Sequence, residues 1–351
     1  RNIPTFDLSY WPSERGPYNY DLPEGEPGYS AGFDENGGLE DPSSRWGGIQ
    51  RALTTTDFES ANIEYIQFWI MDPFNEDSEN TTGGDIYFNL GNVSEDILND
   101  SQLEFENGLP SATNTDLPSD TSSWAIYPDP STFNVVNAFD NSSGNYSLQD
   151  VGLDGMNSSV EREHFSDWLT DLEASNVLTP EAFSTIENDP SSDDFRYFRN
   201  PTSQALEENI IDRYKYFSRY EGNSNTESPD GYPITSTTIP NSEDINQDIT
   251  LGTIESYYQY KISMRPSDLG EANVGNNYIT DVYETLSQSA TSNEQKPIKW
   301  YQFKIPVREY EKRVGSISDF RSIRFMRVFM KGFSQPVTVR FARMELIRGE
   351  W

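Results

Sequence analysis

The stretch WYQFKIPVREYEKRVGSISDFRSIRFMRVFMKGFSQPVTVRFARMELIRGEW, Trp300–Trp351, decides the fold of this chain. It contains two runs rich in β-forming residues, Arg321–Met330 and Pro336–Ile347. A short connection, residues 331–335, separates them and includes a glycine. Two such runs joined by a few residues predict a β-hairpin.

The second of these runs alternates apolar and polar residues, so that Val337, Val339 and Phe341 point to one face. This period of two is typical of a half-buried strand. The apolar positions change phase beyond Ala342 and Arg343. An extra residue on one strand produces such a shift, and we therefore predict a β-bulge at this point.

A lone hairpin is only marginally stable, so these strands need a larger sheet. The best partners lie far upstream, at Asn62–Met71 (NIEYIQFWIM) and Asp85–Leu90 (DIYFNL). Further strands are predicted at Ser256–Met264 and Trp300–Val307. Because the first and last strands are far apart in sequence, we predict a mainly β fold, an antiparallel jelly-roll-like β-sandwich with an α-helical insertion.

We expect a single domain over residues 1–351. A loop-rich arm, 1–50, precedes sandwich strands within 51–110 and 251–351, and a loop and helical insertion occupies 111–250. Helices are predicted over Ser94–Asn99, Val160–Ala174, a segment opened by Thr179 and Pro180, and Gln204–Phe217.

The composition limits the class of protein. Only 34% of residues are hydrophobic but 13% are aromatic, so the core must be built largely on Tyr, Phe and Trp. There is no cysteine, which excludes disulfides and thiolate metal sites. No apolar run approaches the length of a membrane helix. The start at Arg1 and the end at Trp351 suggest a piece cut from a longer protein.

The charge is large and unevenly placed. The formal net charge is -33, yet residues 296–351 carry 13 Lys or Arg against 5 Asp or Glu. An acidic body repels phosphates, so a nucleic-acid partner is not expected. Arg340 and Arg343 on the basic last strand are candidates for binding an acidic partner. The alternative is that the arginines of this region pair with the chain's own acidic body.

Asp244, Asn246, Asp248 and Glu255 have the spacing of oxygen ligands in a calcium loop. The sixth position of such a loop should be glycine, but it is Ile249 here, and a strand follows where a helix would be expected. Despite these differences, Ca²⁺ is the only cofactor that the sequence suggests. The alternative for the same residues is a turn held by hydrogen bonds to Asp and Asn side chains.

Other chemistry is weakly indicated. The only histidine, His164, lies on the apolar face of a predicted helix and is expected to be structural. Five tryptophans could line a sugar-binding groove or could instead anchor the core and loops; they are Trp11, Trp46, Trp69, Trp124 and Trp300. A glycosidase would need a pocket with two carboxylates roughly 5–9 Å apart, and no pair stands out. No catalytic residue is predicted.

Several runs together resemble one family, the SprA (Sov) proteins of the Bacteroidetes. The runs are Tyr10–Tyr20 (YWPSERGPYNY), Arg45–Ile49 (RWGGI), Phe58–Phe74 (FESANIEYIQFWIMDPF), Gly83–Gly91 (GGDIYFNLG), Phe105–Pro110 (FENGLP), Val151–Gly155 (VGLDG), Tyr220–Ser224 (YEGNS), Glu243–Asp248 (EDINQD) and Phe320–Trp351. The resemblance extends nearly from end to end.

The resemblance implies a non-enzymatic role in the outer-membrane translocon of type IX secretion and gliding motility. We expect a soluble domain without membrane-spanning segments, associated with the outer membrane of the cell envelope on its extracellular or periplasmic side. It would cap or shape the protein-conducting pore or dock partners. The implied partners are other secretion components, secreted cargo and the barrel of the full-length protein. The alternatives are a jelly-roll carbohydrate-binding module of a surface protein and a hydrolase.

Overall fold

A computed structural model describes residues 3–75, 82–104, 109–114, 117–129, 145–149, 151–199, 208–220, 241–288 and 294–349. The chain forms two compact units. The first contains Arg1–Ser13, Asp41–Ser94 and Ile254–Trp351, and the second contains Glu14–Glu40 and Glu95–Thr253. The second unit thus begins earlier than the insertion that we expected at 111–250, and it includes much of the loop-rich arm.

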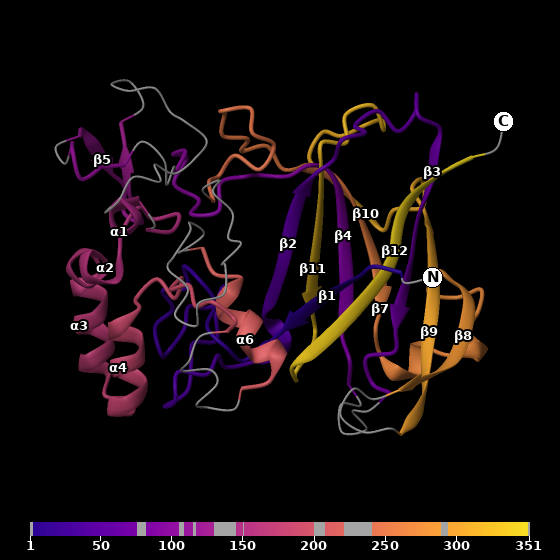
Figure 1. Ribbon diagram of the computed structural model, residues 1–351, viewed down its shortest axis with the longest axis horizontal. Helices are drawn as coiled ribbons and strands as arrows, with labels where there is room; N and C mark the ends of the chain where they lie inside the picture. Colours follow the sequence, from indigo (N-terminus) through magenta and orange to yellow (C-terminus); the bar gives the residue numbers. More distant parts are fainter. Residues whose placement is uncertain are drawn as a thin grey trace. The chain divides into compact units, whose positions relative to one another are not determined.

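The first unit is a β-sandwich of two five-stranded antiparallel sheets (Figure 1). In order across the first sheet, the strands are β1 (Thr5–Tyr10), β12 (Val337–Arg348), β3 (Ile63–Met71), β9 (Gln295–Pro306) and β8 (Ile279–Gln288). Across the second sheet they are β10 (Lys312–Val314), β7 (Ser256–Ser263), β4 (Asp85–Asn92), β11 (Phe325–Lys331) and β2 (Trp46–Ala52). The predicted mainly β sandwich is confirmed.

Aromatic and aliphatic side chains together fill the space between the sheets. Phe68 of β3 is fully buried and lies 5.1 Å, centroid to centroid, from Phe88 of β4 in the opposite sheet. It also contacts Phe303 and Phe341 on the neighbouring strands of its own sheet. Three ring contacts on one buried side chain place the centre of the core here, as the high aromatic content predicted.

The predicted pairing of the two ends of the chain is also confirmed. β12 pairs with β3, with Phe341 opposite Ile70. The register shifts between Ala342 and Glu345, and Arg343 has a φ of 50°. This is the bulge that the change of phase predicted. A left-handed backbone at a residue other than glycine is uncommon, and a bulge is one place where it is tolerated.

The predicted hairpin of the last two strands is wrong. β11 pairs with β4 and β2 in the second sheet, whereas β12 pairs with β1 and β3 in the first. The short connection therefore crosses from one layer to the other. Its Phe333 is 0% exposed and contacts Tyr10, so the crossing is anchored in the core. Alternation of residues defines the buried face of a strand but not its neighbour, because the period is local.

Short helices and long connections make up the second unit. Its elements are β5 (Ser119–Thr121), β6 (Ile126–Pro128), α1 (Tyr146–Gln149), α2 (Ser158–His164), α3 (Ser166–Ser175), α4 (Pro180–Asn188) and α6 (Ile210–Phe217). The sandwich unit adds three short 3₁₀ helices, Pro42–Ser44, Pro266–Asp268 and Glu271–Asn273.

Helix prediction succeeded where a cap was visible in the sequence. Thr179 caps α4 by accepting a hydrogen bond from the amide of Ala182. The helix predicted over Val160–Ala174 is divided at Phe165 into α2 and α3. The helix predicted over Ser94–Asn99 is not formed, because two of its amides bond to the side chain of Glu243. Part of the helix predicted over Gln204–Phe217 lies outside the described residues, and the rest contains α6.

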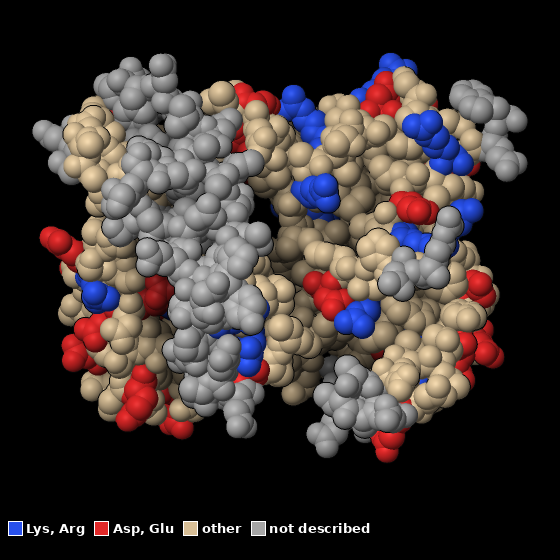
Figure 2. All heavy atoms as spheres, viewed as in Figure 1, with Lys and Arg blue, Asp and Glu red and all other residues tan. Residues whose placement is uncertain are grey.

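Charge is distributed differently over the two units. On the face drawn in Figure 2, basic and acidic side chains both lie over the sandwich strands, whereas acidic side chains predominate over the helices of the second unit. Among the described residues, no helix combines the length and the apolar character that crossing a bilayer requires. The uneven charge in the sequence is therefore carried into the surfaces of the folded units.

Candidate functional site

Three buried carboxylates meet in the second unit. Asp154, Glu161 and Asp193 are each 0% exposed, and one oxygen from each lies within 4.8 Å of the others. We call these three residues the inner centre. Acidic side chains are almost never fully buried unless they are paired, so a cluster of this kind needs a specific reason.

Local structure delivers each carboxylate to the inner centre. Asp154 lies in a turn where Gly152 has a φ of 70° and Gly155 a φ of 69°. A Cβ added to Gly152 would lie 2.0 Å from a carboxylate oxygen of Asp193, so only glycine fits there. Glu161 occupies the first turn of α2, where the helix dipole favours negative charge.

Hydrogen bonds satisfy part of the inner centre. The hydroxyl of Tyr18 donates to Oδ2 of Asp193 (2.8 Å), and the amide of Ser191 donates to Oε2 of Glu161 (3.0 Å). The hydroxyl of Ser191 donates to Asp154. Oε1 of Glu161 and Oδ1 of Asp193 have no partner. A bare pair of charged oxygens would be very unfavourable in this interior, so the cluster must hold a proton or a cation.

The electrostatics of the inner centre favour protonation. Burial, followed by the charges of neighbouring carboxylates, raises the pKa of Asp154 and of Asp193 well above the ordinary value. Burial also raises the pKa of Glu161 from 4.5 to about 7, although the amide of Ser191 opposes the shift. Like charges that share a site cannot all ionise together. Near neutral pH the inner centre is therefore expected to keep at least one proton.

An arginine holds the loop that carries Asp193. The guanidinium of Arg15 donates to the carbonyl oxygens of Pro190 (2.9 Å) and Asp189 (2.8 Å). Burial lowers the pKa of Arg15 to about 10, and the charge of Asp189 opposes that shift. The run Tyr10–Tyr20 thus provides both Arg15 and Tyr18 to the inner centre. Backbone carbonyls, rather than carboxylates, receive the buried donors of this arginine.

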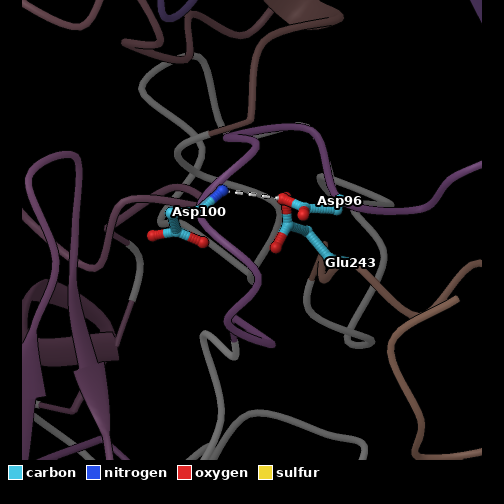
Figure 3. Close-up of side chains that lie close together, drawn as sticks. All are labelled: Asp96, Asp100 and Glu243. Atoms are coloured by element: carbon cyan, nitrogen blue, oxygen red, sulfur yellow. Dashed lines mark hydrogen bonds between the residues drawn. The ribbon is translucent and has the colours of Figure 1, made fainter. Parts of the chain in front are cut away.

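A second group of carboxylates lies in loops of the same unit. Asp96, Asp100 and Glu243 place one oxygen each within 4.8 Å of one another, and we call them the loop centre (Figure 3). The carboxylate of Asp96 accepts hydrogen bonds from the amides of Asp100 and Ser101, both at 3.1 Å. Glu243 is 0% exposed and accepts from the amide of Leu98 (2.9 Å).

A fourth carboxylate, which is buried, is influenced by the charges of the loop centre. Glu104 is 1% exposed, and neither of its oxygens has a hydrogen-bond partner. Burial raises its pKa to about 9, and the next causes are the charges of Asp100, Glu243 and Asp96. The charges of all three members thus act on Glu104, although its oxygens are not among those that lie within 4.8 Å of one another. Oδ2 of Asp100 and Oε2 of Glu243 also lack partners. Several oxygens here are thus available to a ligand.

The four residues predicted to bind calcium are found in two places. Asp244, Asn246 and Asp248 lie together in one loop, and their side chains accept hydrogen bonds from its backbone amides. Asp244, for example, accepts from the amides of Asp248 (2.9 Å) and Ile249 (2.8 Å). Glu255 belongs to the sandwich unit, where it pairs with Arg327 at 3.0 Å. Calcium binding by these residues remains a prediction.

The two arginines predicted to bind a partner differ in their surroundings. Arg340 on β12 makes two hydrogen bonds of 2.8 Å to the carboxylate of Asp7 on the neighbouring strand β1. Arg343 is exposed at the bulge. Arg340 and Asp7 thus form an ion pair between two neighbouring strands of the first sheet. A role of either residue in binding a partner remains a prediction.

The outer face of the first sheet carries a row of large side chains. Met71 of β3 is directly opposite Trp300 of β9, which is directly opposite Tyr283 of β8. Directly opposed residues share a face of the sheet. Tyr283 is 57% exposed, and Trp69, two residues before Met71, is half-buried on the same face. Two of the five tryptophans that were considered as a sugar-binding groove thus lie on one partly exposed surface. We call these four residues the aromatic row.

Sequence reasoning missed the members of both carboxylate centres. Acidic residues are usually solvated, so a pattern of 58 Asp and Glu residues gives no indication of which few are buried. One signal was present. The run Val151–Gly155 has two glycines around Asp154, and closely spaced glycines mark a backbone that approaches other groups closely. His164 was expected to be structural, and its ring contacts Phe165.

Comparison with known protein families gives a match. The family model SprA_N, described as a motility related/secretion protein, matches residues 167–351. These residues include most helices of the second unit and all strands from β7 to β12. The match extends over more than half of the chain. A comparison with curated proteins finds no match.

Proposed function

Because this chain belongs to the SprA_N family of motility-related and secretion proteins, we propose that it is a non-catalytic structural domain of the type IX secretion translocon in the outer membrane. In this role the domain caps or shapes the protein-conducting pore, or docks partner proteins. The family places the chain in secretion or motility. The pore and the docking role are our extension of that assignment.

The aromatic row is the observation that favours docking. Trp69, Met71, Trp300 and Tyr283 form a partly exposed apolar surface on a rigid sheet. Tryptophan and tyrosine are enriched in protein interfaces, because they bury a large area and lose little side-chain entropy. The partner would be another component of the secretion system or a cargo protein. Carboxylates that are 0% exposed can hold protons or ions but cannot contact a large substrate, which fits a non-catalytic domain.

Substitution in the full-length protein tests this proposal. The double variant Trp300→Ala, Tyr283→Ala should lower export of folded cargo several-fold, while the melting temperature of the isolated chain changes little. Trp46→Ala is the matched control, because Trp46 is a 66% exposed tryptophan on the other sheet. It should leave export unchanged. Normal export by the double variant at normal abundance would contradict the docking role.

The same row also favours a second function, a carbohydrate-binding module of jelly-roll type. Flat aromatic rings on a sheet are suited to stacking against sugar rings. Titration calorimetry of the purified chain with polysaccharides distinguishes the two functions. Micromolar binding that Trp300→Ala abolishes would support the module. No heat of binding, together with an export defect in the double variant, would support the translocon domain.

A further inference from the structure

We propose that Asp96, Asp100, Glu104 and Glu243 form a calcium site that stabilises the second unit. This inference does not depend on the function proposed above. The side chains come from two separate loops, because Asp96, Asp100 and Glu104 follow β4 and Glu243 lies some 140 residues later. Figure 3 shows Asp96, Asp100 and Glu243. A bound ion would therefore link two loops that are distant in the sequence.

The spacing of the oxygens fits calcium. Ca²⁺ binds oxygen ligands at about 2.3–2.6 Å, so two ligands on opposite sides of one ion are about 4.8 Å apart. The oxygens of Asp96, Asp100 and Glu243 lie within 4.8 Å of one another, which allows all three to reach one ion. Six to eight oxygens are required in total, and three bidentate carboxylates supply up to six of them.

The unpartnered oxygens give independent support. Both oxygens of Glu104 lack a hydrogen-bond partner although the residue is 1% exposed. The same is true of one oxygen of Glu243, which is 0% exposed, and of one oxygen of Asp100. Buried polar atoms are normally hydrogen-bonded, and a cluster of exceptions needs an explanation. A cation in contact with these oxygens would provide it.

The local charges point the same way. Asp96, Asp100 and Glu243 bring three acidic side chains within 4.8 Å of one another. Burying several carboxylates without a counter-charge is strongly unfavourable, and a divalent cation offsets the repulsion. Mg²⁺ is less suitable, because it demands a small octahedral shell and retains its water.

The site differs from the calcium loop predicted from the sequence. In that loop the carboxylates of Asp244 and Asp248 are engaged with backbone amides. Glu243, the residue just before it, has instead an oxygen without a partner. The two possibilities can be separated by mutation, because Asp248 can be changed without changing any of the four proposed ligands.

The test is thermal unfolding of the purified chain in EDTA and in calcium chloride. At a calcium concentration about 100 times the dissociation constant, the second unit should melt about 5–10 °C higher than in EDTA. The effect of Glu104→Gln on the melting temperature should have opposite signs in the two conditions. In EDTA it should raise the melting temperature, because it removes the cost of protonating a buried carboxylate on folding, and in calcium it should melt below the wild type. If Glu104 had a purely structural role, the effect of the substitution on the melting temperature would have the same sign in both conditions.

Terbium provides a direct readout of binding. Calcium should displace bound terbium and so remove its emission. This calcium-sensitive emission should be absent in Glu104→Gln and in Asp100→Asn, and the matched control Asp248→Asn should retain it. The proposal would be overturned by an absence of any calcium shift in the wild type, by an equal shift with magnesium, or by loss of binding in Asp248→Asn alone.

Discussion

The interior of the sandwich unit is apolar, whereas the second unit encloses carboxylates. In the sandwich, Phe68 is surrounded by other aromatic rings, and the sheets supply the backbone hydrogen bonds. In the second unit, Asp154, Glu161 and Asp193 are 0% exposed and are held by hydroxyls and amides. A continuous apolar core is stabilised by burial of area at any pH, but a polar interior depends on protons and ions. The two units should therefore respond differently to mutation and to pH.

The largest expected effect is in the apolar core. Phe68→Ala should lower the free energy of unfolding of the sandwich unit by about 3–5 kcal/mol, because it removes a buried ring and leaves a cavity. Urea unfolding followed by tryptophan fluorescence measures the change. Phe6→Ala is the control, since Phe6 is 49% exposed on the edge strand β1, and it should cost about 1 kcal/mol or less. Similar costs for both variants would contradict the location of the core.

The next effect is the pH dependence of the second unit. The pKa of Glu161 is raised from 4.5 to about 7, chiefly by burial, so the folded state binds a proton more tightly than the unfolded state. The stabilisation is complete below about pH 4.5 and is lost as the pH rises through about 7. Unfolding of the second unit should become easier over this range, by up to about 1.4 kcal/mol per pH unit for one proton.

Two variants of α2 isolate this effect. Glu161→Gln should reduce the slope of stability against pH, because it cannot ionise. Glu163→Gln changes an exposed residue of the same helix and should keep the slope of the wild type. Urea unfolding at a series of pH values gives both slopes. If Glu161→Gln retains the full slope, Glu161 does not carry the proton of the inner centre.

The smallest effect concerns the surface ion pair of the sandwich. Arg340→Glu places a negative charge beside Asp7 and should lower the free energy of unfolding by about 0.5–1 kcal/mol, which is visible as a small fall in melting temperature. Adding Arg343→Glu should change stability little, because Arg343 is exposed. If neither change affects the melting temperature but binding of a partner is lost, these arginines form a docking patch.

Much of the sandwich could be predicted from the sequence, because a strand with one buried face imposes a period of two on its residues. The strands at Asn62–Met71, Asp85–Leu90 and the chain end were recognised in this way, and the phase change at Arg343 revealed the bulge. The N-cap Thr179 predicted the start of α4 for a similarly local reason, since a cap bonds only to the next few amides.

Partners and buried charges were decided by the tertiary structure alone. The connection that contains the buried Phe333 joins β11 in one sheet to β12 in the other. No local sequence pattern distinguishes this crossing from a hairpin turn. Asp154 and Glu104 have the same side-chain chemistry as dozens of solvated acids in this chain. Their burial depends on loops that are distant in sequence, and so does the burial of the residues around them. The sequence by itself thus determined which segments become strands and where charge accumulates, and packing between remote segments decided which strands meet and which carboxylates are enclosed.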